Sequence, residues 1–200
     1  MIKKYREFIN ENLYENKKIF MEDLGIVESQ FSGKTKIEKD LYINTKFIPD
    51  GFNPNVVGSI SIKHDVDLPK GFSPIVSGAL QMKEVTKIPE NFKPVIGQYL
   101  NAMSVKSVGE GFAPQVGTRL FLNSLKELPR GFAPSVGDDM LIYSLYSQSG
   151  IFDLSGVKEI AIKSSKENMG KLTYIGPLSD YMPIGGGKLR IPDDAWEKLR

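Results

Sequence analysis

The sequence predicts a mainly β fold in which the chain winds into a solenoid with a single short strand in each coil. Phenylalanine recurs every 20 residues from Phe52 to Phe132, and proline follows two positions later in every copy. A repeat of fixed length is typical of solenoids. Each copy also has apolar residues two positions apart, such as Leu120 and Leu122, which places both on one face of a short strand. Because the repeat is too short for a strand and a crossover helix, successive strands should form a parallel sheet.

The residue before each repeating phenylalanine predicts a backbone corner in the left-handed region. Four copies have glycine there, and the fifth has Asn91. Asparagine is among the non-glycine residues that best tolerate a positive φ, so a shared corner explains both residue types. We therefore expect a positive φ at Gly51, Gly71, Asn91, Gly111 and Gly131.

Other columns of the repeat predict the interior of the coils. The phenylalanines should stack as one buried ladder because no copy replaces them with a polar residue. The inward columns of the strand are Ile60, Leu80, Leu100, Leu120 and Met140, and two positions later Ile62, Met82, Ala102, Leu122 and Ile142. The first complete coil is irregular, since Asp65 stands where the later coils have an apolar residue such as Val85. We expect a bulge or a slip of one residue at this point.

The motif Leu125-x-x-Leu128-Pro-x-x-Phe132 resembles the LxxLPxxF segment of leucine-rich repeats, and Leu120-x-Leu122 resembles their strand. The asparagine of the standard LxLxxNxL pattern is missing from this chain. The likeness is therefore to short, divergent leucine-rich-like repeats of the form LPxGFxPxVG, as in proteins of bacteria and their phages. This resemblance covers about half of the chain, implies a binding scaffold, and transfers no catalytic residue.

The chain divides into three predicted segments. Residues 1–40 should form a helical N-terminal cap with a connection, because apolar residues recur at helical spacing over residues 3–23. Residues 41–147 should form the solenoid of about five repeats. Residues 148–200 should form a mixed α/β C-terminal cap, with a strand at Val157–Lys163. Caps are expected because the end coils of a solenoid otherwise expose core and strand edges.

The composition favours a cytoplasmic protein without disulfides or cofactors. The chain has no cysteine and a formal net charge of +2, with basic and acidic residues evenly mixed. We see no signal peptide and no run of about 20 apolar residues that could span a membrane. If a phage encodes the protein, the expected compartment is the host cytoplasm.

No motif predicts catalysis or a metal site. His64, Asp65 and Asp67 lie close in sequence, but the chain has no second histidine to complete a metal site. The run Gly185–Lys188 lacks the glycine spacing of a phosphate-binding loop and is followed by Leu189. We therefore expect a protein that is not an enzyme and binds no metal or cofactor.

The outward positions of the predicted strands suggest a partner-binding surface. They change from small polar residues in the first coils to aromatic and apolar residues in the last three. The candidate partner-binding residues are Tyr99, Met103, Arg119, Phe121, Leu141 and Tyr143. Tyr, Phe, Met and Arg are enriched at protein interfaces. The competing interpretation is that the segment after Ser147 folds back and covers these residues.

The leading functional hypothesis is a protein-interaction scaffold that binds another protein through its outer sheet face. The repeat resemblance suggests a setting, in which a phage or mobile-element protein acts as an inhibitor of a host defence complex. The alternative is a nucleic-acid or nucleoprotein binder that uses Lys63, Lys83 and the lysines of the caps. A strong fall of affinity with added salt would favour this alternative.

Overall fold

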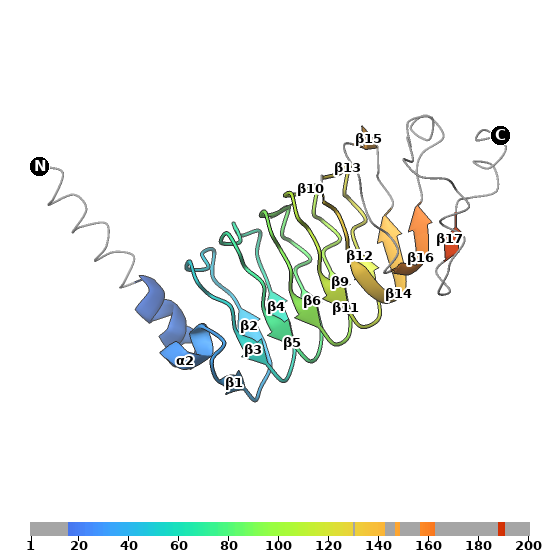
Figure 1. Cartoon of the computed structure of the whole chain (residues 1–200). Coiled ribbons are helices and arrows are strands. Elements are labelled where there is room, and N and C mark those ends of the chain that lie inside the picture. Colours follow the sequence, from blue (N-terminus) through green and yellow to red (C-terminus); the bar gives the residue numbers. More distant parts are fainter. Residues whose placement is uncertain (1–15, 130, 143–146, 149–156, 163–187, 191–200) are drawn as a thin grey trace, which may run out of the picture.

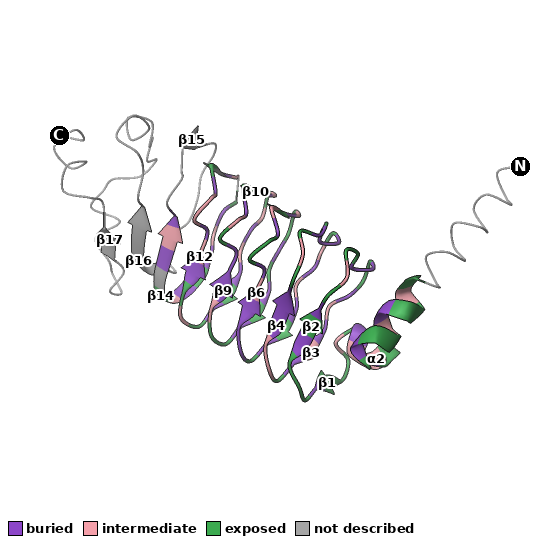
Figure 2. Ribbon diagram, turned by 180° about the vertical axis from the view of Figure 1, so that it is seen from behind, coloured by how far each residue is buried: buried purple, intermediate pink, exposed green. Residues whose placement is uncertain are grey.

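The computed structural model shows a parallel β-solenoid of about five turns with a period of about 20 residues (Figure 1). It describes residues 16–129, 131–142, 147–148, 157–162 and 188–190. Two ladders of short parallel strands run along the solenoid, and a third is present in part. The buried apolar side chains of successive coils form one continuous core along the solenoid. Figure 2 colours the buried residues of the coils purple.

The first ladder consists of the strands β1 (Lys36–Ile37), β3 (Asn55–Val56), β5 (Ile75–Val76), β8 (Val95–Ile96) and β11 (Gln115–Val116). The second ladder consists of β2 (Leu41–Ile43), β4 (Ile60–Ile62), β6 (Leu80–Gln81), β9 (Leu100–Asn101) and β12 (Leu120–Phe121). The strand β14 (Ser135–Ile142) pairs with both β11 and β12 and so joins the two ladders. It is followed by β16 (Val157–Ile162), at the place where the sequence predicts a strand, and by β17 (Lys188–Arg190).

The prediction of one strand per coil needs correction. A third ladder comprises β7 (Lys87–Ile88) with β10 (Ser107–Val108), and β13 (Glu127–Leu128) with β15 (Ser147–Gln148). Coils in the described part of the chain therefore contain two or three short strands. The physical reason is that the return arcs also stack at the repeat distance, and their backbone N–H and C=O groups pair with the neighbouring coil.

The register follows the sequence repeat. In the second ladder Leu80 pairs with Leu100, and Leu100 pairs with Leu120, each at an offset of one 20-residue repeat. The first coil is one residue shorter, because Leu41 pairs with Ile60. The stack of coils thus places equivalent residues of successive repeats directly beside one another.

The predicted phenylalanine ladder is confirmed. The side chains of Phe52, Phe72, Phe92, Phe112 and Phe132 are fully buried. Neighbouring ring centroids along this ladder lie between 5.2 and 6.3 Å apart, and three of the four contacts are stacked. The rings form a continuous aromatic column through the core, with area burial and ring contacts that both favour folding.

The predicted corner before each phenylalanine is also confirmed. The φ angle is 82° at Gly51, 75° at Gly71, 71° at Gly111 and 71° at Gly131. At Asn91 it is 58°, so asparagine adopts the same left-handed conformation as the glycines of its column. Backbone geometry, rather than a need for a small side chain, explains the residue types in this column.

The first complete coil is irregular at the predicted position. Val66 is buried there, whereas Asp65 is exposed. The Asp65 carboxylate accepts a hydrogen bond of 2.9 Å from the backbone N–H of Thr86 and bonds of 3.1 Å from its hydroxyl. The aspartate therefore ties two neighbouring coils together instead of filling the core.

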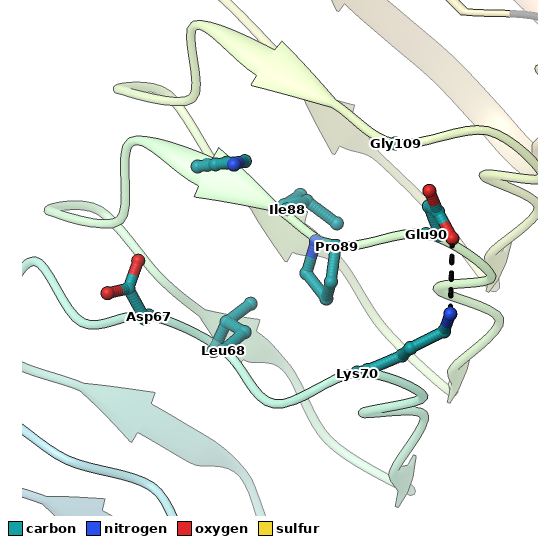
Figure 3. A pocket seen from close by; sticks show the side chains of 8 residues that line it. Asp67, Leu68, Lys70, Ile88, Pro89, Glu90 and Gly109 are labelled. Atoms are coloured by element: carbon teal, nitrogen blue, oxygen red, sulfur yellow. Dashed lines mark ion pairs between the residues drawn. The ribbon is translucent and has the colours of Figure 1, made fainter.

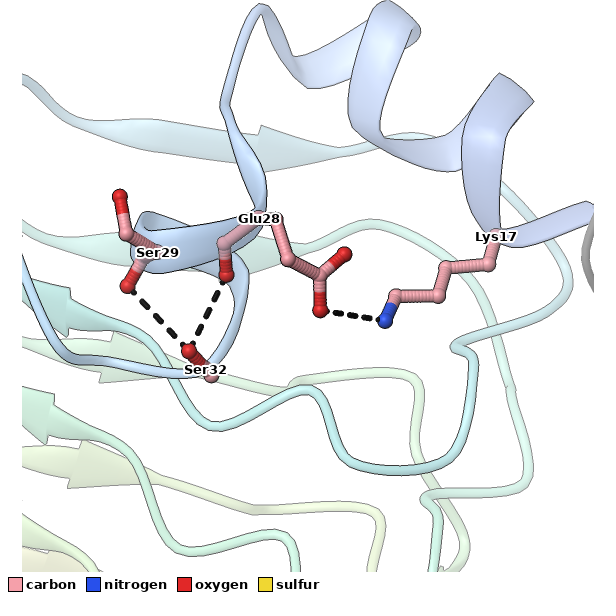
Figure 4. Close-up of polar contacts among 4 residues, drawn as sticks. All are labelled: Lys17, Glu28, Ser29 and Ser32. Atoms are coloured by element: carbon pink, nitrogen blue, oxygen red, sulfur yellow. Dashed lines mark hydrogen bonds and ion pairs between the residues drawn. The ribbon is translucent and has the colours of Figure 1, made fainter.

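The N-terminal segment packs over the first coil. Residues 16–24 are helical, and α2 (Glu28–Phe31) follows within the segment predicted as a connection. The ring centroids of Phe20 and Phe31 lie 5.0 and 5.3 Å from that of Phe52, so they extend the aromatic column. The ammonium of Lys17 pairs with Glu28 at 2.7 Å, while the Ser32 hydroxyl bonds to carbonyls of α2 (Figure 4).

The predicted helix over residues 3–23 is therefore seen in its described part, and residues 1–15 lie outside the described residues. The predicted C-terminal cap lies almost wholly outside them as well. Among the residues that the structure describes, no helix is long and apolar enough to cross a membrane.

Candidate protein-interaction face

The outer side of the second ladder presents one residue per strand between the inward-pointing residues. Strand pairing aligns these residues in a single column, which we call the outer column: Tyr42, Ser61, Gln81, Asn101, Phe121 and Leu141. Tyr42 is 63% exposed, whereas Phe121 and Leu141 are half-buried. The column is small and polar in the middle coils and apolar beyond Asn101.

An aromatic pair lies at the apolar end of the outer column. The rings of Tyr99 and Phe121 meet edge to face, with centroids 6.3 Å apart and an interplanar angle of 85°. Both side chains are half-buried, and Met103, just after β9, is 39% exposed. Edge-to-face contacts orient aromatic rings, so this pair presents a defined apolar surface to the outside of the solenoid.

A shallow groove of about 510 Å³ follows this pair, and we call it the Tyr99–Phe121 groove. It is lined by Tyr99, Asn101, Thr118, Arg119, Phe121 and Asp138. The groove runs from β9 and β12 to the corner between the two ladders, where the N–H of Asp138 donates to the carbonyl of Thr118 at 2.8 Å. Stacked coils thus bring six residues of three successive repeats into one site.

Three of the predicted partner-binding residues, Tyr99, Arg119 and Phe121, line this groove. Leu141 pairs with Phe121 on the neighbouring strand, and Met103 is exposed two residues after Asn101. Tyr143 lies outside the described residues.

The sequence analysis missed Asn101, Thr118 and Asp138 as groove residues. Thr118 and Asp138 occupy equivalent positions of successive repeats, one residue before the outward Arg119 position, so the 20-residue spacing is the signal that could have found them.

Two buried amide oxygens near Phe121 have no hydrogen-bond partner. Asn101 is only 9% exposed, and its Oδ1 atom is buried without a donor. The Oδ1 atom of Asn123, two residues after Phe121, is also buried without a donor. Burying an unpaired acceptor typically costs about 1–3 kcal/mol. Such groups are rare in folded proteins and call for an explanation.

A second hollow of about 440 Å³ lies on the third ladder (Figure 3). Its floor includes Leu68, Ile88 and Pro89, and the ammonium of Lys70 pairs with Glu90 at 3.4 Å on one side. Gly109 stands here where the neighbouring repeats have proline, and its N–H donates to the Ile88 carbonyl at 2.9 Å. The hollow combines apolar lining residues with charges of both signs.

The acidic residues beside His64 are a candidate metal site in the sequence, and one of them, Asp65, has a structural role instead. The Asp65 carboxylate is bonded to Thr86 on the next coil. Within the described ranges, no group of three or more His, Cys, Asp or Glu side chains is arranged to hold a metal ion.

The lysines of the first coils form only a short row. Lys63 and Lys83 are exposed at equivalent positions, and the next two coils have Met103 and Asn123 there. The Lys63 ammonium lies 6.0 Å from the centroid of the Tyr42 ring. Two lysines in line make a small positive patch compared with the 6–10 phosphate contacts typical of a strong nucleic-acid binder.

Comparisons of the chain with models of protein families, with curated proteins and with solved structures find no match. The likeness to leucine-rich repeats therefore stays a likeness of motif. What the structure shows is the coarser architecture, a parallel β-solenoid with a period of about 20 residues. The site has to be interpreted from its own geometry.

Proposed function

We propose that this protein is an interaction scaffold, a divergent leucine-rich-like solenoid that binds another protein through the outer face of its second ladder. The observation that carries the proposal is the edge-to-face pair of Tyr99 and Phe121 beside the groove. The N-terminal helical segment acts as a cap in this proposal, because Phe20 and Phe31 cover the first ring of the aromatic column.

The residue types of this face favour a protein as the partner. Tyr, Phe and Arg dominate the binding energy of many protein interfaces when they lie in a pocket that partner residues can fill. Aromatic side chains lose little rotamer entropy on binding and bury a large apolar area. An exposed methionine beside them adds an adaptable apolar contact. The expectation that the partner is a host defence complex rests on the repeat resemblance alone and stays a prediction.

Site-specific photocrosslinking tests the proposal. The full chain carries p-benzoylphenylalanine in place of Phe121, and irradiation in a lysate of the cells that make the protein is followed by mass spectrometry. We expect one protein adduct that forms at position 121 and persists after nuclease treatment. The partner is then purified and titrated by calorimetry, and Tyr99→Ser should weaken binding at least about tenfold, as expected for a hot-spot aromatic.

The matched control places the same crosslinker at Ile75. This residue is 48% exposed, but it lies on the first ladder, outside the proposed face. Equal adducts from positions 121 and 75 would show that the crosslinks are nonspecific and would contradict the proposal. Adducts that disappear with nuclease would favour the nucleic-acid alternative instead.

A further inference from the structure

The two unpaired amide oxygens near Phe121 indicate what the partner contributes. Oδ1 of Asn101 is buried at the Tyr99–Phe121 groove, and Oδ1 of Asn123 is buried two residues beyond Phe121. Asn101 pairs in register with Phe121, so its amide lies about one strand spacing, ~4.8 Å, from the aromatic position. An acceptor that lacks a donor in the free protein is a place where a bound donor gains a full hydrogen bond.

The groove offers acceptors and aromatic rings together. Besides Asn101, it contains the carboxylate of Asp138, which has several acceptor positions and can accept more than one hydrogen bond. The rings of Tyr99 and Phe121 form its apolar part. The charge of Arg119 offsets that of Asp138, so the two formal charges of the groove sum to zero. A group that donates several hydrogen bonds and stacks on a ring complements this combination.

We propose that the groove receives an arginine side chain of the protein partner, an inference that rests on the proposed function. The guanidinium N–H groups donate to Oδ1 of Asn101 and to the carboxylate of Asp138, while the guanidinium plane stacks on the ring of Tyr99 or Phe121. Rotation about the broad χ2 torsion of Asn101 turns its amide oxygen toward the incoming donor.

Arginine satisfies this site better than other side chains. Its guanidinium is planar, presents five donors, stacks on aromatic faces and is weakly hydrated. A lysine ammonium is a compact and strongly hydrated charge that does not stack in this way. An acidic side chain has no donor for the unpaired Oδ1 of Asn101 and would lie beside the carboxylate of Asp138. The partner segment should therefore present an exposed arginine to the second ladder.

Titration with capped peptides tests the inference on the full-length, ¹⁵N-labelled protein. The probes are acetyl-Gly-X-Gly-amide peptides in which X is arginine, lysine, glutamine or glutamate. We expect the arginine peptide to shift the side-chain amide signals of Asn101 in a saturable way. Its affinity should exceed those of the other peptides at least about fivefold, since a hydrogen bond to a charged group and ring stacking each add free energy.

The variant Asn101→Leu separates a binding role from a structural one. Replacing a buried amide whose oxygen has no donor by an apolar group of similar size should leave the melting temperature equal or higher. The same variant should lose the preference for the arginine peptide. Gln81→Leu is the matched control, because Gln81 occupies the same outer column but does not line the groove, and arginine binding should persist there.

Several results would overturn the inference. These are equal affinities for the arginine, lysine and glutamine peptides, unchanged arginine binding in Asn101→Leu, or a lower melting temperature of that variant. None of them affects the scaffold proposal if the crosslink at position 121 still identifies a protein. Conversely, arginine-peptide binding without any protein adduct at position 121 would count against the scaffold and leave the groove chemistry in place.

Discussion

The inner and outer sides of the second ladder obey different rules, although they belong to the same strands. On the inner side, Leu80, Leu100 and Leu120 repeat the same residue and are fully buried. On the outer side, the residues that directly follow them are glutamine, asparagine and phenylalanine. A buried position packs against its equivalents in the next coils, so one residue type fits all of them. An outer position lies outside the core column, where no single residue type has to pack against its equivalents, and it can therefore differ from coil to coil.

The first prediction concerns the core, where the same residue type recurs in every coil. Phe92→Ala should lower the free energy of unfolding by about 3–5 kcal/mol, because it opens a cavity in the middle of the aromatic column. Urea denaturation followed by circular dichroism measures the effect. The control Ile75→Ala removes an exposed aliphatic side chain and should cost no more than about 0.5 kcal/mol. Equal costs for the two variants would contradict the inner and outer assignment.

The second prediction separates two reasons for a glycine that recurs in the repeat: a close approach between coils and a positive φ. A Cβ atom at Gly117 would overlap the backbone carbonyl of Gly97 on the previous coil. Gly117→Ala should therefore destabilise by about 3 kcal/mol, the upper end of the roughly 1–3 kcal/mol cost of an overpacked site, because the overlap is with backbone atoms. At Gly71 there is open space, but φ is +75°, so Gly71→Ala should cost only about 1–2 kcal/mol from the left-handed conformation.

Denaturation midpoints of the two alanine variants, measured side by side, check this order. If Gly71→Ala is the more destabilising change, the close approach between coils at Gly117 is not a real constraint. Asn91→Gly serves as the neutral reference, since asparagine already adopts the conformation of the corner.

The residues that repeat could be predicted from the sequence, because each repeat supplies an independent copy of the same physical requirement. The buried phenylalanines and the positive φ at Asn91 follow from columns in which the residue types leave one explanation. The third ladder could not be predicted in this way. Its strands, such as β7 and β10, contain a single buried residue each, whereas the second ladder shows a second apolar column two positions on, as Leu122 follows Leu120.

The candidate site could be predicted only in part for a related reason. Tyr99, Arg119 and Phe121 stood out because aromatic and arginine residues are unusual at outward positions. Asn101 is also outward, but it is only 9% exposed and pairs in register with Phe121, and the sequence does not specify this burial. The corner residue Asp138 joins the groove through the path of the backbone between two ladders, which no single repeat specifies.

The last prediction concerns the outer side of the second ladder, where the main expected effect is on binding rather than on stability. Phe121→Ser removes a half-buried ring and its edge-to-face contact with Tyr99, and this contact is worth about 0.5–1.5 kcal/mol beyond the area that the ring buries. The melting temperature should fall by about 2–4 °C for each ~1 kcal/mol lost in a chain of this size. Calorimetric titration with the crosslinked partner should show a loss of affinity of at least about thirtyfold, as for a hot-spot residue.

The matched control for this prediction is Tyr42→Ser, since Tyr42 belongs to the same outer column but lies at its opposite end and is more exposed. This variant should keep both its melting temperature and its affinity for the partner. If residues 148–200 instead cover Phe121 within the same chain, Phe121→Ser should destabilise by about 3–5 kcal/mol, as the loss of a core aromatic does. A Phe121→Ser variant that remains stable and binds at full affinity would refute the interaction face, because this variant lacks the ring on which the proposed binding surface centres.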